Sequence, residues 1–194
     1  MRRVFMARMQ KGCAKMIVSF GTVDIKMAEF GSYEELEEAL AQCENGSIFA
    51  GQKKGTENAW NMIAVTDNDT GDYFGIGLLT SSPAEPHALI LDNGTLFLGG
   101  DSFAIAFDIY QKQVRTLMPL PSDFVDFIYI EEKHAVLIVH KKGVIAKDEE
   151  CTEIWRNSPG LISSYSVDGD VFIMEKAHGG PVAFKIKNGK KVEL

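Results

Sequence analysis

Residues 94–108 read GTLFLGGDSFAIAFD: two apolar runs, a small polar break between them and an aspartate at the end. Each run has the length of a β-strand, and glycine with aspartate in the break is typical of a tight turn. The stretch therefore predicts the central hairpin of an antiparallel β unit. Whether this unit stands alone or recurs decides the fold.

The same pattern recurs twice in the rest of the chain. Residues 88–120, 127–157 and 161–194 each contain an apolar strand, a turn, a strongly apolar strand, a polar break, a third strand, a turn and a weaker fourth strand. A period near 40 residues with four strands per unit is typical of β-propeller blades. The positions that align are Leu96, Val136 and Val171 in the second strand, and Ala106, Ile145 and Phe184 in the third.

The repeat resembles that of quinoprotein (PQQ-like) and WD40-like β-propellers, in which glycine, an apolar strand, glycine, an apolar strand and aspartate form the middle of a blade. Gly94, Gly99 and Asp108 fit this pattern in the first unit. The second unit has His134 in place of the leading glycine, and the third lacks the closing aspartate. The resemblance covers residues 88–194, about half of the chain. It implies propeller-type blades and says nothing about a quinone cofactor, which most proteins with such repeats do not bind.

The segment before the repeats, residues 16–80, has mixed α and β character. Residues 32–45 predict a helix, because Ser32 can cap it, Glu35 stands three residues on, and apolar side chains follow at helical spacing. One or two strands are expected before the helix. A hairpin is expected over residues 57–80, around the turn TDNDTGD. The predicted fold class is mainly β, with about three four-stranded antiparallel propeller-like units after a small strand–helix–hairpin segment.

Three such units cannot close a propeller, which needs at least four blades. Residues 16–80 could supply a fourth sheet; alternatively, the units stack, form one twisted sheet, or are completed by a partner. Residues 81–87, SSPAEPH, predict a linker, and residues 88–194 are expected to form one continuous fold. Residues 1–15 hold five basic residues and no acidic one. We expect them to be a disordered or mis-assigned leader.

The composition points to an acidic cytoplasmic protein. The 194-residue chain has a formal net charge of −7, and the part after residue 15 has a charge of −12. Such a body repels phosphate backbones, which argues against nucleic acid and favours a basic partner. No apolar run reaches the ~18–20 residues of a membrane span. Three cysteines without a C-x-x-C spacing fit a reducing compartment.

No catalytic constellation emerges from the sequence. The turn with Asp67, Asp69 and Asp72 resembles a calcium loop, but Leu78 stands where an EF-hand needs glutamate. No carboxylate or thiolate accompanies the histidines at a zinc spacing. Nucleophile-elbow and phosphate-loop patterns are absent. We therefore predict no enzymatic activity, no metal and no cofactor.

A small, acidic, β-rich chain of this kind fits a non-enzymatic protein-binding module. Its character resembles that of bacterial immunity proteins, including those of contact-dependent inhibition, which neutralise a cognate toxin by direct binding. That resemblance implies a basic toxin as partner, facing acidic side chains. Two alternatives stay open: a small-ligand-binding or enzymatic propeller-like protein, and a self-associating scaffold. The candidate partner-binding residues are Glu35 and Glu38 on the helix and Asp67, Asp69 and Asp72 in the turn.

Overall fold

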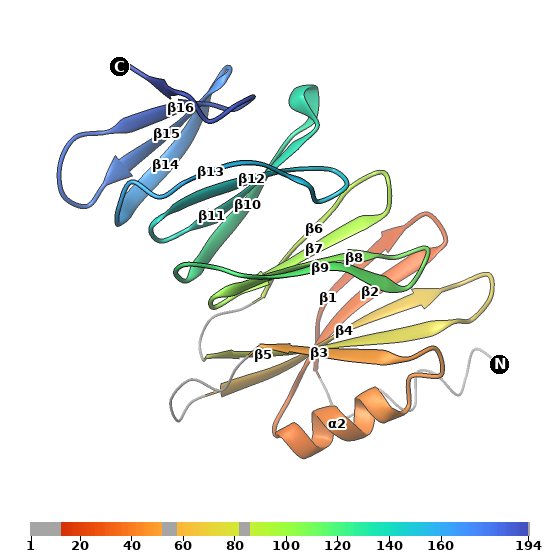
Figure 1. Cartoon of the computed structure of the whole chain (residues 1–194). Coiled ribbons are helices and arrows are strands. Elements are labelled where there is room, and N and C mark those ends of the chain that lie inside the picture. Colours follow the sequence, from red (N-terminus) through yellow and green to blue (C-terminus); the bar gives the residue numbers. More distant parts are fainter. Residues whose placement is uncertain (1–12, 52–57, 82–85, 194) are drawn as a thin grey trace. The chain divides into compact units, whose positions relative to one another are not determined.

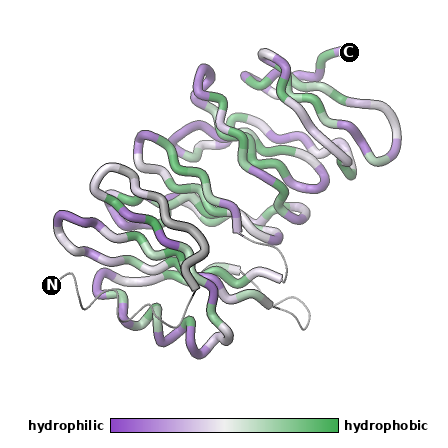
Figure 2. The backbone as a smooth tube through the Cα atoms, turned by 180° about the vertical axis from the view of Figure 1, so that it is seen from behind, coloured by the Kyte–Doolittle hydropathy of each residue, from purple (hydrophilic) through white to green (hydrophobic). Residues whose placement is uncertain are grey.

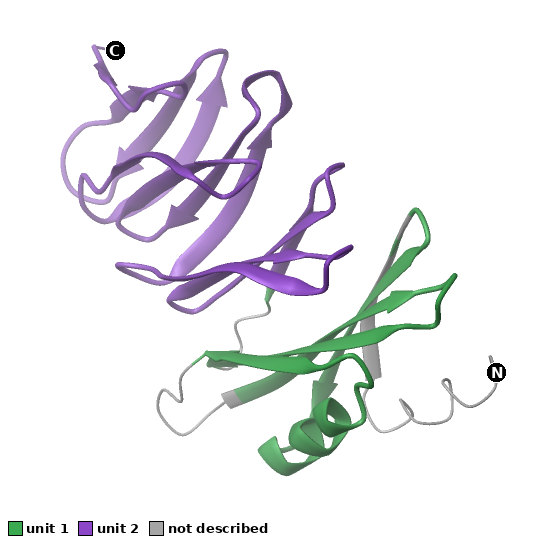
Figure 3. Cartoon of the chain, turned by 45° about the vertical axis from the view of Figure 1, so that its right-hand side comes forward, with its two compact units in different colours: residues 1–86 green, residues 87–194 purple. Residues whose placement is uncertain are grey.

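The computed structural model describes residues 13–51, 58–81 and 86–193. The chain divides into two compact units, residues 1–86 and 87–194, and each is treated by itself (Figures 1 and 3). The predicted linker ends at this boundary, where His87 already belongs to a strand. Residues 82–85 of that linker lie outside the described residues.

Unit 1 is a five-stranded sheet with one described helix. The strands β1, β2, β4 and β5 are antiparallel neighbours in that order, and β3 pairs in parallel with β5 at the edge. The bounds are β1 Cys13–Phe20, β2 Val23–Phe30, β3 Ser47–Gly51, β4 Asn58–Asp67 and β5 Tyr73–Ser81. This confirms the predicted hairpin as β4 and β5. Residues 13–15 of the expected leader belong to β1, and residues 1–12 lie outside the described part.

Helix α2, Tyr33–Ala41, begins at a capping box. The Ser32 hydroxyl accepts the N–H of Glu35 at 3.2 Å, and the Glu35 carboxylate accepts the N–H of Gly31 at 3.0 Å. The first bond satisfies a backbone donor that the first turn of a helix leaves unpaired, and the second holds the residue before the cap. The sequence-based start of the helix is therefore confirmed.

The apolar face of α2 covers the sheet. Leu36 and Leu40 are buried and pack with Met62 and Ala64 of β4. The predicted helix over residues 32–45 is too long, because α2 ends at Ala41. The four residues that follow Gln42 form a turn, which leads the chain back into the sheet at β3.

Unit 2 consists of three four-stranded antiparallel meanders that follow one another along the chain (Figure 1). This confirms the three predicted propeller-like units, which form separate sheets and not one continuous sheet. Blade 1 is β6 His87–Ile90, β7 Thr95–Gly100, β8 Phe103–Asp108 and β9 Gln113–Pro119; blade 2 is β10 Phe124–Ile130, β11 Ala135–His140, β12 Gly143–Asp148 and β13 Glu153–Asn157; blade 3 is β14 Ile162–Asp168, β15 Val171–Lys176, β16 Val182–Lys185 and β17 Lys191–Val192.

Gly94 and Gly99 stand where neighbouring aromatic rings leave no room for a side chain. Gly94 has a φ of +81°, in the region that side chains disfavour, and its α-carbon lies against the ring of Tyr110. Gly99 has an ordinary strand conformation, but a Cβ there would lie 2.5 Å from the ring of Phe124. The second glycine therefore allows the first strand of blade 2 to approach blade 1.

The aspartate that closes the same stretch fixes the turn after β8. Asp108 accepts two backbone N–H groups of that turn, at 2.8 and 3.0 Å, and Arg115 donates to its second oxygen at 2.7 Å. Burial alone would raise the pKa of this carboxyl, but these hydrogen bonds and the guanidinium charge hold it below its usual value. In blade 2, Asp148 takes the same place and accepts the N–H of Thr152 at 2.7 Å.

Hydrophobic segments run along the blade strands (Figure 2), and the middle blade contributes buried apolar side chains to the cores on both of its faces. Residues 135–139 are all buried, with at most 1% of each side chain exposed. Alternate residues along a strand face opposite sides, so each face packs against a different blade. Val136, Ile138 and Ile145 pack with Phe97, Ala104 and Ala106 of blade 1, whereas Leu137, Val139 and Val144 pack with Phe172, Met174 and Phe184 of blade 3.

Blades 2 and 3 are also joined by a tryptophan. The indole N–H of Trp155 donates to the carbonyl of Ile186 at 2.5 Å, and its ring lies against Gly189. Only 9% of Trp155 is exposed. Trp155 therefore serves core packing between these two blades.

The packing of Phe124 against Gly99 predicts that Gly99→Ala destabilises the protein. A methyl group in a filled contact forces neighbouring rings to shift, which costs about 1–3 kcal/mol. We expect that loss in the free energy of unfolding measured with urea. Gly180→Ala is the matched control, because a Cβ at Gly180 meets nothing within 4 Å. Equal stability of Gly99→Ala and wild type would show that Phe124 does not hold the two blades together.

Candidate functional site

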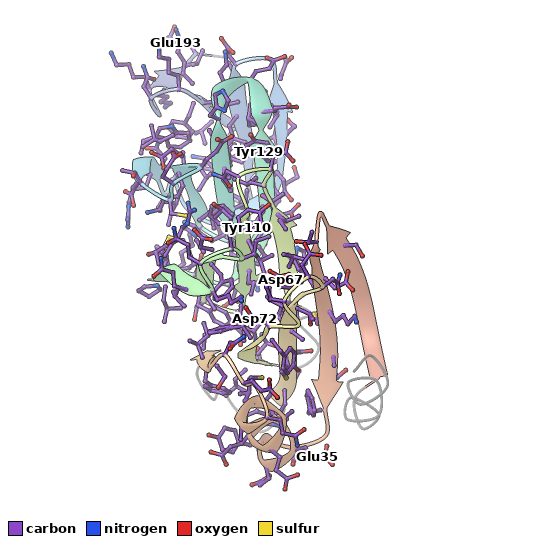
Figure 4. All side chains as sticks on the ribbon, turned by 90° about the vertical axis from the view of Figure 1, so that its right-hand side faces the viewer. Glu35, Asp67, Asp72, Tyr110, Tyr129 and Glu193 are labelled. Atoms are coloured by element: carbon purple, nitrogen blue, oxygen red, sulfur yellow. The ribbon has the colours of Figure 1, made fainter. Side chains whose placement is uncertain are left out.

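The acidic residues predicted to bind a partner fall into two separate groups in unit 1 (Figure 4). In the pairing of β2 with β4, Phe30 lies opposite Trp60 at the helix end, whereas Val23 lies opposite Asp67 at the other. Seven residues of extended strand separate these ends, which is ~23 Å. Glu35, in the first turn of α2, and Asp67 therefore do not belong to one patch.

Two of these five carboxylates already accept nearby backbone N–H groups. Asp67 accepts the N–H groups of Asp69 and Thr70 at 2.9 and 3.3 Å, and it is half-buried, as is Asp72. Glu35 is half-buried in the capping box. Among the five candidates, only Glu38 and Asp69 are exposed. Of the five candidates, these two are the most accessible to a partner.

The exposed side of α2 carries a denser group of carboxylates than the sequence-based choice named. Glu34, Glu37 and Glu38 are exposed and stand three and four residues apart, which places them on one helix face. The last turn of the helix holds no basic residue. These three carboxylates therefore form a negative surface next to the helix N-terminus.

Exposed aromatic rings border this negative surface. Tyr33 and Phe49 are 40% and 42% exposed, and their rings meet edge to face with centroids 5.8 Å apart. Tyr33 also meets Trp60 at 5.4 Å and donates to Glu37 at 3.2 Å. The negative charge of Glu37 raises the pKa of the tyrosine. We call Tyr33, Phe49, Glu34, Glu37 and Glu38 the acidic–aromatic surface.

A second polar group lies in unit 2, where the first strands of the three blades meet. The Asp126 carboxylate on β10 is 3.4 Å from His87 Nδ1 on β6, and it accepts the hydroxyl of Tyr165 on β14 at 2.8 Å. Its own strand contributes the N–H of Phe127 at 2.9 Å. Burial, followed by the hydrogen bond to Asp126, raises the pKa of Tyr165 to about 12.

A bulge in β10 turns Asp126 towards both neighbouring blades. Phe124 pairs with His140 and Asp126 with Val139, so Val125 is the extra residue. Bulges re-aim side chains and are frequent beside binding sites. A register shift at the same place in β14, between Ile162 and Ser164, shows that the feature recurs in the repeat.

His140 is the most buried of the histidines in the described residues, with 0% exposure. Its Nδ1 is 2.8 Å from the Ser122 hydroxyl and 3.4 Å from the N–H of Lys142. The N–H of Lys142 also donates to the Ser122 hydroxyl at 3.0 Å, and the buried Nε2 of His140 has no hydrogen-bond partner among the described residues. Burial, followed by the nearby charges of Arg156 and Lys142, lowers the pKa of the imidazole, so it is neutral near pH 7. His140 ties the start of β10 to the turn after β11.

The two buried free cysteines are packing residues. Cys43 packs under α2 and Cys151 packs between blades 1 and 2. Burial raises the pKa of each thiol to about 11, which disfavours the reactive thiolate. No three His, Cys, Asp or Glu side chains in the described residues gather closely enough to hold a metal ion. The same residues contain no helix long and apolar enough to span a bilayer.

Neither the Asp126 group nor the aromatic half of the acidic–aromatic surface is predicted from the sequence. The sequence pattern places His87 in the linker, and the second predicted unit begins one residue after Asp126. A signal was present, because His87, Asp126 and Tyr165 are each 39 residues apart, close to the repeat period. The Tyr33 contacts had no such signal, since β3 joins the sheet by parallel pairing across α2.

Comparison with known proteins gives distant structural likenesses. The sequence matches no protein-family model and no curated protein. The computationally designed protein Ika4 has 14% identity and a TM-score of 0.45 over 58% of this chain and 73% of its own. The designed protein Ika8 has 13% identity and a TM-score of 0.48 over 93% of this chain. Saccharomyces cerevisiae Sqt1 has 9% identity and a TM-score of 0.48 over 93%.

The present chain spans 61% of the length of Ika8 and of Sqt1. Likenesses of this strength say nothing about function. The assignment of blades rests instead on the strand order and register of the chain itself.

The buried, neutral His140 predicts a loss of stability on the acid side. Its pKa is lower in the folded than in the unfolded chain, so the unfolded chain binds the proton first. The free energy of unfolding should therefore fall below about pH 6.5, by up to about 1.4 kcal/mol per pH unit, until the folded pKa is reached. Urea titrations above and below this pH should show the slope.

His140→Gln should remove most of that slope, whereas His178→Gln, at an exposed position, should keep it. A slope that persists unchanged in His140→Gln would assign the acid sensitivity to other groups.

Proposed function

We propose that this chain is a non-enzymatic protein-binding module whose partner is a basic protein. The acidic–aromatic surface supports the proposal most directly. Protein interfaces are enriched in exposed tyrosine and other aromatic side chains, which bury large areas on binding. Here Tyr33 and Phe49 lie beside three carboxylates, and helix α2 contains no lysine or arginine that would neutralise them.

The combination suits lysine or arginine side chains of a partner. A cation gains from a carboxylate and from an aromatic ring face at the same time, because both present negative charge. The net charge of −7 attracts a basic partner from a distance, and salt screens that attraction. Complex formation should therefore weaken as ionic strength rises.

The narrower form of the proposal is that the partner is a toxin and the chain is a bacterial cytoplasmic immunity protein. It rests on the acidic, β-rich character of the chain. In that case binding would cover the active site of the toxin or the approach of its substrate. A basic toxin encoded beside this gene would support it, and an isolated gene would count against it.

Pull-down from the native host, with the purified protein as bait, tests the broader proposal. We expect one stoichiometric basic protein that is released by salt. Glu37→Gln with Glu38→Gln should weaken its binding about tenfold, since exposed ion pairs contribute modestly each. The charge-matched control Glu132→Gln with Glu150→Gln should leave binding nearly unchanged.

If both double variants weaken binding equally, the loss comes from the change in net charge. That result would refute the acidic–aromatic surface as the binding site. Capture of no partner at either salt concentration would favour the self-associating scaffold or a ligand-binding protein.

A further inference from the structure

The Asp126 carboxylate differs from the structural carboxylate of the same fold. Asp108 and its partner Arg115 form an ion pair in which the aspartate side chain is 7% exposed. The Asp126 side chain is 41% exposed, although three donors already hold it. No lysine or arginine in the described residues lies within ion-pair distance of it. A carboxylate with a purely structural role is expected to be buried and paired with a base, as Asp108 is.

The hydrogen bonds to the Asp126 carboxylate do not use all of its acceptor sites. An ionised carboxylate has about four acceptor sites, two on each oxygen. His87 and the N–H of Phe127 approach Oδ1, and the Tyr165 hydroxyl donates to Oδ2. One acceptor site on Oδ2 therefore remains. It belongs to a half-exposed side chain that residues of the two other blades hold in place.

Aromatic rings pack against His87 and Tyr165, the two side chains that hold this carboxylate. His87 meets the ring of Phe124 edge to face at 5.3 Å, and Phe124 meets Phe127 at 4.6 Å. Tyr165 completes the group and packs against Phe172 at 6.0 Å. Aromatic rings around an oriented carboxylate favour a cation with N–H donors over a neutral or anionic group.

We propose that Asp126, with His87 and Tyr165, forms a binding site for one guanidinium or ammonium group, presented by a lysine or arginine side chain of the partner protein. The cationic group donates to Asp126 Oδ2 and lies against the rings of the first strands. The site rests on the proposed function, in which the partner is basic. The site lies entirely within unit 2.

Titration of the full chain with a tetra-arginine peptide at low ionic strength, followed by NMR, tests the site without the natural partner. We expect the Tyr165 and His87 ring signals to shift. Asp126→Asn keeps the shape and an acceptor oxygen but removes the charge, and should weaken the shift of the Tyr165 signal about fivefold, the upper range for a half-exposed ion pair. Asp168→Asn, at an exposed position of the same unit, is the charge-matched control.

Tyr165→Phe tests whether Asp126 binds a cation or only holds blades 2 and 3 together. It removes the hydroxyl that occupies Oδ2, so peptide binding, read from the His87 signals, should be retained or strengthened even if the blades are less stable. Loss of binding in Tyr165→Phe, or equal weakening in Asp126→Asn and Asp168→Asn, would overturn the proposal.

The signals also separate this proposal from the broader one. Shifts at Tyr33 and Glu37 without shifts at Tyr165 would refute the Asp126 site and leave the acidic–aromatic surface standing. An absence of shifts at both places would count against both.

Discussion

Both faces of the central strands in the middle blade of unit 2 are apolar and buried. Five consecutive residues, 135–139, are apolar and buried, and alternate side chains enter the cores on its two sides. Each fully buried Leu, Ile or Val stabilises the folded state by about 1.5–3 kcal/mol relative to exposure. Blade 2 therefore needs a packing partner on each face. Blade 1 covers one face and blade 3 covers the other.

Close approach of the blades decides where small and aromatic residues stand. Gly99 leaves room for Phe124, and Gly189 leaves room for Trp155, at the two contacts of blade 2 with its neighbours. The first strands β6, β10 and β14 lie at blade edges, so their side chains are only partly covered. The same stacking that builds the cores thus leaves a row of half-exposed polar groups, with Asp126 in the centre.

The repeat could be predicted from sequence because it depends on local patterns. Alternation, turn residues and a period near 40 residues identified all three four-stranded units. The helix start at Ser32 followed from a capping box that is complete within four residues. Its end did not, because Cys43 continues the apolar spacing and is buried although the helix has already ended at Ala41.

The candidate sites were harder to predict because they depend on contacts between distant residues. A run of glutamates on α2 was visible, but the exposed Tyr33 and Phe49 pair forms only when β3 joins the sheet beside β5. Asp126 looked like any solvated carboxylate until the bulge at Val125 and the neighbouring blades gave it three donors. Asp67 and Glu35, prominent in the sequence, are partly occupied by backbone N–H groups.

Native-state hydrogen exchange of the full chain tests the central role of blade 2 most directly. Amides in cooperatively buried strands open only with global unfolding, whereas exposed edge strands open locally. The structure predicts the slowest exchange of unit 2 in β11 and β12, and markedly faster exchange in β14, where Ser163, Ser164 and Ser166 are exposed. Exchange in β11 and β12 as fast as in β14 would contradict a stack built around the middle blade.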